Sequence, residues 1–580
     1  MRDSINKLWP FLKPVRKKQI LFLFILMITS SIFEVVSIGS VVPFLGILLS
    51  PEQVLNNDIA GPILLYFNLV NSDELINVFS SLFIIAALIS GFSRFMLLFL
   101  QKRIGHGIGS DLSHDVFRKT LYQPYKTFLD MNSSELIAGI STKISVVTGS
   151  VLIPTLQLIS SIFVITSILL ILLILDPYLS IFTFLTFGLI YSSILFLTRK
   201  QIKNNSKKIS ISSESLIKVI QESLGGIRDI LIDGTQDQYC GIYKKYDSPL
   251  RKSKANTEII SGMPKFFIET LGIVLIAIVA LNFSKTENGL IDAIPVLGAL
   301  AIGAQRLLPV IQQVYASITM IKGENDSFND IINLLNQPLP SYLFNQNQNL
   351  NFKDNIEFKD LFFKYDDSSE WIFNNLNFKI RKGSRIGLVG TTGSGKSTFL
   401  DLCMGLLLPS KGSILVDDVQ INSENFRSWQ SNLSHVPQSI FLSDASLTEN
   451  IAFGVPSEKV DIEKVKRAAK QAQVYDLIES LPAKFNTRVG ERGIKFSGGQ
   501  RQRIGIARAL YKDSDFIIFD EATSALDNET EIKVMNSINS LDRNITFLLV
   551  AHRLSSLKGC DIIIEIQQGE IKLIENNQIK

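Results

Sequence analysis

The sequence has few charged residues and very few cysteines for a chain of its length. Only 19% of its 580 residues are charged, against about 25% in a typical soluble protein, and 46% are hydrophobic. The three cysteines, Cys240, Cys403 and Cys560, lie far apart without metal-ligand spacing, so a disulfide framework is not expected. The net charge of +4 excludes the strongly basic character of a dedicated nucleic-acid binder, and no nucleic-acid partner is expected.

Long uncharged runs account for the low charge content. Residues 144–175 and 177–198 contain no Asp, Glu, Lys or Arg. About 20 apolar residues are enough to cross a bilayer, so both runs are predicted to be transmembrane helices. Four further spans are predicted, and the six together make residues 1–335 a membrane domain: 19–49, 75–100, 146–175, 177–198, 259–283 and 290–321.

Basic residues predict the orientation of this domain. Residues 50–74 contain no Lys or Arg, whereas residues 101–147 contain six and residues 199–257 contain twelve. Because loops rich in Lys and Arg stay on the cytoplasmic side, both termini and both long loops are expected there. These loops are too long to lack structure, and we expect them to be helical extensions of the spans.

The chemistry of the chain changes after the last predicted span. Residues 336–353 are rich in Asn, Gln and Pro, which is typical of a linker. From 354 to 580, short apolar strands such as 386–389 and 516–519 alternate with helical stretches such as 459–480. This alternation predicts a soluble α/β domain.

A phosphate-binding loop opens this second domain. The motif G-x-x-x-x-G-K-[ST] begins at Gly390, between a predicted strand and a predicted helix. Its glycines let backbone N–H groups converge on phosphates, Lys396 can meet the β- and γ-phosphates, and Ser397 can ligate Mg²⁺. The predicted nucleotide contacts are Gly390, Thr391, Thr392, Gly393, Ser394, Gly395, Lys396, Ser397 and Thr398.

Two carboxylates follow a buried strand in the same domain. Asp520 and Glu521 come directly after the apolar residues 516–519. A carboxylate at the end of a strand that faces a phosphate-binding loop can hold Mg²⁺ through water, which is the predicted role of Asp520. The next carboxylate, Glu521, can orient and deprotonate an attacking water.

Residues 496–503, Phe-Ser-Gly-Gly-Gln-Arg-Gln-Arg, resemble the signature motif of ATP-binding-cassette proteins, with Phe496 in the usual place of leucine. The resemblance extends over about 354–575, and the six spans ahead of it match the layout of an exporter half-transporter. It implies a six-helix, all-α exporter-type transmembrane domain followed by an α/β P-loop ATP-binding-cassette domain. The other matching elements are Tyr365 (stacking on adenine), Gln438 (Q-loop), Thr487–Gly493 (the loop before the signature), Ser524–Asp527 (D-loop) and His552 (switch histidine).

The family resemblance also implies how the site would work. It implies a homodimer in which Ser497, Gly498, Gly499 and Gln500 of one chain close on ATP held by the P-loop of the other. Lys396, Glu521 and His552 would be catalytic, with ATP and Mg²⁺ as cofactors and Ser397, Gln438 and Asp520 around the metal. Short coupling helices are expected near Tyr122–Asp130 and Ser223–Asp233.

Four ionisable residues lie inside the predicted spans: Glu34, Arg94, Lys265 and Arg306. Such residues are costly in a membrane and are candidates for substrate contacts. Three cations against one acid suit a substrate that carries phosphate. The alternatives are side chains that reach the membrane edge, or an internal pair between Glu34 and an arginine.

The order of these residues resembles bacterial flippases for lipid-linked oligosaccharides. In those proteins another basic residue follows the arginine of span six, where this chain has Gln312 and Gln313. The resemblance implies a flippase in the bacterial plasma (inner) membrane that moves a lipid-linked oligosaccharide outward by alternating access. A lipid A-type lipid, multidrug or peptide exporter remains the alternative.

Overall fold

The computed structural model describes residues 6–49, 71–175, 177–283, 289–343, 350–366, 368–551 and 557–574. The chain divides into two compact units. The membrane unit comprises Met1–Gln123 and Asp130–Pro338, and the cassette unit comprises Pro124–Leu129 and Leu339–Lys580. The short segment Pro124–Leu129 therefore groups with the second unit, although it lies between two helices of the first.

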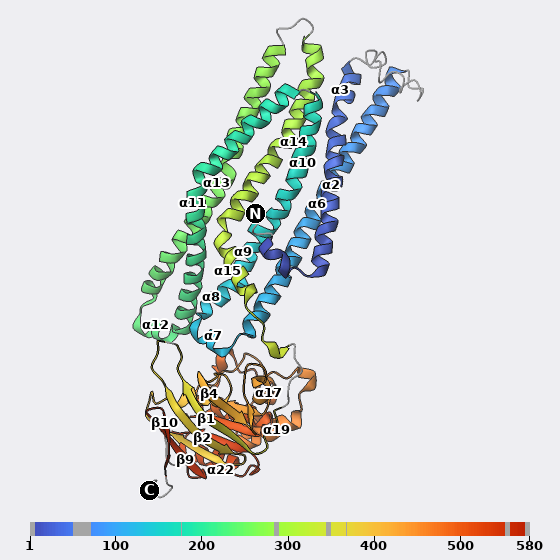
Figure 1. Cartoon of the computed structure of the whole chain (residues 1–580). Helices are drawn as coiled ribbons and strands as arrows, with labels where there is room; N and C mark the ends of the chain where they lie inside the picture. Colours follow the sequence, from blue (N-terminus) through green and yellow to red (C-terminus); the bar gives the residue numbers. More distant parts are fainter. Residues whose placement is uncertain are drawn as a thin grey trace. The chain divides into compact units, whose positions relative to one another are not determined.

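In the residues that the structure describes, the membrane unit is built of helices (Figure 1). The predicted spans fall on helical backbone, except that a turn at Ser40 divides the first into α2 and α3. Within the described residues, Pro14–Leu48, Asp73–Leu121 and Ser133–Ile171 are long and apolar enough to cross a membrane, and the total of six spans stays a prediction. The helices of this unit are η1 (Trp9–Phe11), α2 (Pro14–Gly39), α3 (Val41–Leu49), α6 (Ser72–Leu121), α8 (Ser133–Ile137), η2 (Ala138–Lys143), α9 (Ile144–Val147), η3 (Thr148–Leu152), α10 (Ile153–Leu175), α11 (Pro177–Gly225), α12 (Ile227–Asp233), α13 (Gln236–Phe283), α14 (Gly289–Gly323) and α15 (Asn325–Asn336).

Three helices are more than twice as long as a bilayer requires. α6, α11 and α13 have 50, 49 and 48 residues. At 1.5 Å per residue each is about 70–75 Å long, more than twice the thickness of the hydrocarbon core. The expectation that the long loops continue the spans as helices is confirmed, and the short helices α7 (Tyr125–Asp130) and α12 lie at the predicted coupling positions.

Glycines let α6 approach the third predicted span closely. A Cβ atom on Gly109 would overlap the side chain of Thr148, and one on Gly105 would lie 2.6 Å from Ile153. The two glycines are four residues apart and so occupy one face of α6. Thr148 begins the π-helical turn η3, which ends just before Pro154, a residue that cannot donate a backbone hydrogen bond.

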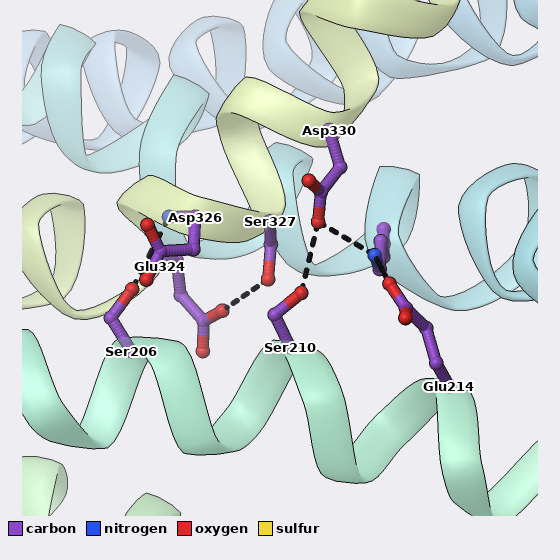
Figure 2. Close-up of polar contacts among 8 residues, drawn as sticks. Ser206, Ser210, Glu214, Glu324, Asp326, Ser327 and Asp330 are labelled. Atoms are coloured by element: carbon purple, nitrogen blue, oxygen red, sulfur yellow. Dashed lines mark hydrogen bonds and ion pairs between the residues drawn. The ribbon is translucent and has the colours of Figure 1, made fainter.

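A buried ammonium joins three helical segments of the membrane unit. The side chain of Lys143 at the end of η2 is 3% exposed, and it forms ion pairs with Glu214 of α11 and with Asp330 of α15, the latter at 2.6 Å. Ser210 on α11 also donates to Asp330 at 2.9 Å, so this carboxylate is held from two helices. Figure 2 shows Ser210 and Glu214 on one helix, both directed towards Asp330 and its neighbours.

The cassette unit contains two sheets. One has the order β2-β1-β4-β5, and its paired strands are antiparallel. The other has the order β10-β9-β3-β8-β7-β6 and is parallel except for the edge strand β10. The strands are β1 (Asn355–Phe363), β2 (Phe373–Arg381), β3 (Arg385–Val389), β4 (Lys411–Val416), β5 (Val419–Gln420), β6 (Leu433–Val436), β7 (Phe516–Asp520), β8 (Thr546–Val550), β9 (Ile562–Gln567) and β10 (Glu570–Ile574).

Helices surround the parallel sheet, and alternate residues of its strands enter two different cores. On β7, Phe516 and Ile518 belong to the core that contains α16, whereas Ile517 and Phe519 belong to the core that contains α21. Burial on both faces explains why this strand is apolar at four consecutive positions. The described helices of the unit include α7, α16 (Lys396–Cys403), α17 (Phe426–Ser431), α18 (Leu447–Ile451), α19 (Ile462–Gln471), α20 (Tyr475–Ser480), α21 (Gly498–Tyr511) and α22 (Asn528–Asn539).

Candidate functional site

The phosphate-binding loop leaves the carboxyl end of β3 and enters α16. Gly390, Gly393 and Gly395 have φ values of 152°, 84° and 100°, which residues with a side chain rarely adopt. Lys396 Nζ donates to the carbonyl oxygens of Gly390 at 2.8 Å and Thr391 at 2.9 Å, so its ammonium lies over the loop. This geometry suits a phosphate chain, because the loop brings backbone N–H groups, a cation and a helix N-terminus together.

The register of the sheet brings the two carboxylates to the same edge as this loop. Val550 of β8 pairs with Leu388 of β3 on one side and with Asp520 of β7 on the other. Burial and the neighbouring Glu521 raise the pKa of Asp520, while Lys396 acts in the opposite direction. Lys396 and Asp520 are therefore electrostatically coupled, as expected for groups that share a phosphate–metal site.

Glu521 is held by hydrogen bonds from two other segments. Gln438, two residues after β6, donates from Nε2 to Glu521 Oε2 at 2.6 Å. The backbone N–H of Glu521 donates to Val550 O at 3.1 Å, and its φ of 49° lies in the left-handed region. A non-glycine residue in that region costs of order 1–3 kcal/mol and occurs often at functional sites.

The signature residues form the N-terminus of α21. Ser497 is exposed and accepts from the backbone N–H of Gln500 at 3.3 Å, while Gln500 Oε1 accepts from the N–H of Ser497 at 2.9 Å. Gln502 in the next turn binds Ser524 Oγ and the backbone N–H of Ala525. A Cβ on Gly499 would lie 2.9 Å from Ala525 O, so the signature and the D-loop are packed together.

Tyr365 and the helix α7 approach the phosphate-loop side of the cassette unit. Tyr365 forms a hydrogen bond of 3.1 Å with Thr398 Oγ1 in the first turn of α16. Burial, then the charge of Asp401 and the proximity of Tyr365, raise the pKa of Tyr125 on α7. Tyr125 therefore lies near Asp401 of α16 and near Tyr365.

The expected Mg²⁺ ligands suit that ion. Ser397, Gln438 and Asp520 supply hydroxyl, amide and carboxylate oxygens, the hard donors that Mg²⁺ prefers. The described residues contain no cluster of three or more His, Cys, Asp or Glu able to hold a metal. His552, two residues after β8, lies outside the described residues.

Three of the four intramembrane candidates form one cluster. Glu34 on α2 is buried, and its carboxylate lies 3.4 Å from Arg94 Nε on α6 and 3.4 Å from Arg306 Nη1 on α14. Ser90, one turn before Arg94, donates to Glu34 Oε2 at 2.7 Å. The cluster thus contains two guanidinium groups and one carboxylate.

Lys265 lies outside this cluster. Its ammonium lies 3.8 Å from the carboxylate of Glu269, one turn along the same helix, and about half of each side chain is exposed. Gln312 joins three helices instead, because it accepts from Tyr191 Oη and donates to Ser261 O, both at 2.9 Å. Gln313 donates to Gln157 Oε1 at 3.1 Å. Both glutamines therefore have structural partners.

Sequence analysis missed Ser90, Gln502 and the Lys143 cluster. Ser90 could have been found, because a residue four positions before Arg94 lies on the same helical face. Gln502 lies within the signature sequence, but its hydrogen bond to the D-loop joins residues 23 positions apart, so the motif alone does not indicate it. Lys143 belongs to no motif, and its partners are 71 and 187 residues away, so no local pattern indicates it.

Comparisons with known proteins support the same architecture. The family described as ABC transporter matches residues 373–524, and the ABC transporter transmembrane region matches residues 19–303. An ATP-dependent lipid A-core flippase of Saccharophagus degradans is 29% identical over 509 residues, covering 85% of this chain and 83% of that protein. A protein of the same name from Pseudomonas aeruginosa is 27% identical over 540 residues, covering 91% and 86%.

A solved structure extends the similarity to the fold. The structure of a bacterial Atm1-family ABC exporter with ATP bound matches with a TM-score of 0.77 at 21% identity, and the match covers 97% of this chain and 96% of that chain. The predicted fold class, an exporter-type transmembrane domain followed by an α/β cassette domain, is confirmed.

Proposed function

The chain belongs to the ATP-binding-cassette transporters and is an ATP-driven exporter with its membrane and nucleotide-binding halves on one polypeptide; we propose that it flips a lipid-linked, phosphate-bearing substrate, specifically a lipid-linked oligosaccharide. The substrate would move from the cytoplasmic to the outer side of the bacterial plasma (inner) membrane by alternating access. Both termini and the cassette would lie in the cytoplasm, as the basic loops predict.

The cluster of Glu34, Arg94 and Arg306 carries the substrate proposal. Two guanidinium groups share one carboxylate, with both ion-pair distances at 3.4 Å, so the cluster holds one positive charge in excess. The side chains of Arg94 and Arg306 are 44% and 27% exposed, whereas that of Glu34 is 3% exposed. A phosphate would meet accessible arginine forks, and these bind phosphate in a bidentate manner.

The energy source would be hydrolysis of ATP in the cassette. Lys396 would stabilise the β- and γ-phosphates, and the hydrogen bond from Gln438 would hold Glu521 in place to accept a proton from the attacking water. His552 would contact the γ-phosphate. Mg²⁺, held by Ser397, Gln438 and Asp520, would supply neutralisation of phosphate charge.

We propose that two copies of the chain assemble as a homodimer. The exposed Ser497 stands at the N-terminus of a 14-residue helix, where partial positive charge favours a phosphate. Each chain carries the P-loop, Glu521 and His552, so both composite sites of such a dimer would be competent.

A lipid A-type lipid is the second candidate substrate. The names of the relatives from Saccharophagus degradans and Pseudomonas aeruginosa favour it, and it also carries phosphate. Proteoliposomes that contain either a polyprenyl-pyrophosphate sugar or lipid A separate the two readings. ATP-dependent translocation of the polyprenyl-pyrophosphate sugar would support a lipid-linked oligosaccharide as the substrate. Translocation of lipid A alone would identify a lipid A-type lipid as the substrate instead. Stimulation of ATPase activity only by apolar amines would instead favour a multidrug exporter.

A further inference from the structure

An apolar cavity of about 400 Å³ lies beside the N-terminal end of α2, within the membrane unit. Its walls come from η1, α2, α6, the η3–α10 segment and α15, and they include Trp9, Lys17, Phe24, Ile108 and Leu156. The volume falls within the usual range of ligand pockets. No residue of the Glu34 cluster lines it, so it is separate from the proposed substrate site.

The walls of the cavity offer almost no polar group to a ligand. Besides Lys17 and the indole of Trp9, the only polar side chain among the lining residues is Thr155, and its hydroxyl already donates to Val151 O at 2.6 Å. Leu21 and Phe24 are 64% and 41% exposed although they line the cavity. An apolar space open to a membrane environment suits a hydrocarbon chain better than water.

One end of the cavity is positively charged. Lys13, Arg16, Lys17 and Lys18 lie within six residues, and no Asp or Glu occurs between Asp3 and Glu34. Asp111 of α6 engages Lys13 at 2.9 Å and Arg16 at 2.7 Å, and its single negative charge leaves three of the four positive charges in excess; of the four basic residues, Lys17 is the one that lines the cavity. Lys17 Nζ lies 5.4 Å from the ring centre of Trp9, at the edge of the cavity.

We propose that this cavity binds an anionic phospholipid of the cytoplasmic leaflet, with an acyl chain between α2 and α10 and the headgroup phosphate at Lys17. Basic residues and tryptophan are the side chains that meet lipid headgroups at a membrane–water interface. The excess positive charge selects an anionic over a zwitterionic headgroup. A lipid at this site would join η1 to the first three predicted spans.

Trp9 makes the proposal directly measurable. The chain has three tryptophans, and the other two, Trp371 and Trp429, belong to the cassette unit. Bromine atoms on a lipid acyl chain quench tryptophan fluorescence on contact. The full-length protein is therefore reconstituted in phosphatidylcholine with a minor fraction of brominated phosphatidylglycerol or of brominated phosphatidylcholine. The variant Trp9→Phe gives the fluorescence of Trp371 and Trp429 alone, which is subtracted from that of the wild-type protein.

Brominated phosphatidylglycerol should quench Trp9 more strongly, with a relative affinity about fivefold higher, since one lysine near an anionic lipid gives about that factor. In Lys17→Gln, the ratio of the affinities for the two lipids should fall close to one. Lys18→Gln is the matched control, because this exposed neighbour does not line the cavity and should leave the preference largely intact. Equal quenching by both lipids in the wild-type protein, or an unchanged ratio in Lys17→Gln, would overturn the proposal.

A second pair of variants tests the cavity itself. Thr155→Phe introduces a ring into the wall, whereas Thr166→Phe makes the same change on the exposed face of α10, where Thr166 likewise bonds to the carbonyl four residues earlier. Only Thr155→Phe should abolish the preference for phosphatidylglycerol. If Thr155→Phe separates a dimer into single chains without changing the lipid ratio, a second copy rather than a lipid covers the cavity.

Discussion

Replacing Lys143 by methionine should destabilise the part of the membrane unit where η2, α11 and α15 meet. Methionine keeps the length of the side chain but removes the ammonium that pairs with Glu214 and Asp330. Removing one partner of a fully buried ion pair costs about 3–5 kcal/mol. Here the two carboxylates remain 34% and 38% exposed, so water compensates part of the loss, and we expect about 2 kcal/mol.

The loss of stability is measurable as a decrease in the apparent melting temperature of the full-length protein in detergent. A change of about 2 kcal/mol corresponds to a decrease of several degrees for a unit of this size. The triple variant Lys143→Met, Glu214→Gln, Asp330→Asn removes the unpaired carboxylates and should recover at least half of the decrease. Lys207→Met, an exposed lysine on α11, is the control. A decrease no larger than that of Lys207→Met, or no recovery in the triple variant, would refute this account of the cluster.

Three further perturbations test the site and the packing. Glu521→Gln should lower ATP hydrolysis by about 10²-fold or more while nucleotide binding is retained, and wild-type phosphate release would contradict its role as base. Burial lowers the pKa of His435 to about 4, because the folded protein favours the neutral imidazole. The contribution of this residue to the free energy of unfolding is therefore fully present above about pH 6.5 and is lost as the pH falls towards 4. His435→Gln should therefore flatten the fall in melting temperature between pH 7 and pH 5, and an unchanged slope would exclude this histidine as its source. Gly109→Val should cost about 1–3 kcal/mol by overlap with Thr148, whereas Gly91→Val, which has open space around it, should melt like the wild-type protein.

The local geometry of the candidate nucleotide site could largely be predicted because its motifs are local. Nine consecutive residues from Gly390 specify the phosphate-binding loop, and an apolar strand followed by Asp520 and Glu521 specifies the opposite side of the site. The hydrogen bond between Gln438 and Glu521 was not predictable, since it joins residues 83 positions apart. It depends on the strand order β8-β7-β6, which no local pattern encodes.

The intramembrane charges show the limit of sequence reasoning more clearly. The Lys265–Glu269 pair could have been found, because residues four apart on a helix are neighbours. The choice between a basic wall and an internal Glu34–Arg pair could not be made from sequence, since the pairing needs three helices from distant parts of the chain. Glu34 engages both Arg94 and Arg306, so the cluster has one excess positive charge rather than two.

Translocation in proteoliposomes tests the central claim most directly. We predict that the wild-type protein moves a fluorescent polyprenyl-pyrophosphate sugar across the bilayer only when ATP is supplied. Glu521→Gln should abolish this movement, and Arg306→Gln should reduce translocation while basal ATP hydrolysis is retained. Movement without ATP, equal translocation by Arg306→Gln, or transport of apolar amines with no movement of the phosphate-bearing lipid would contradict the account.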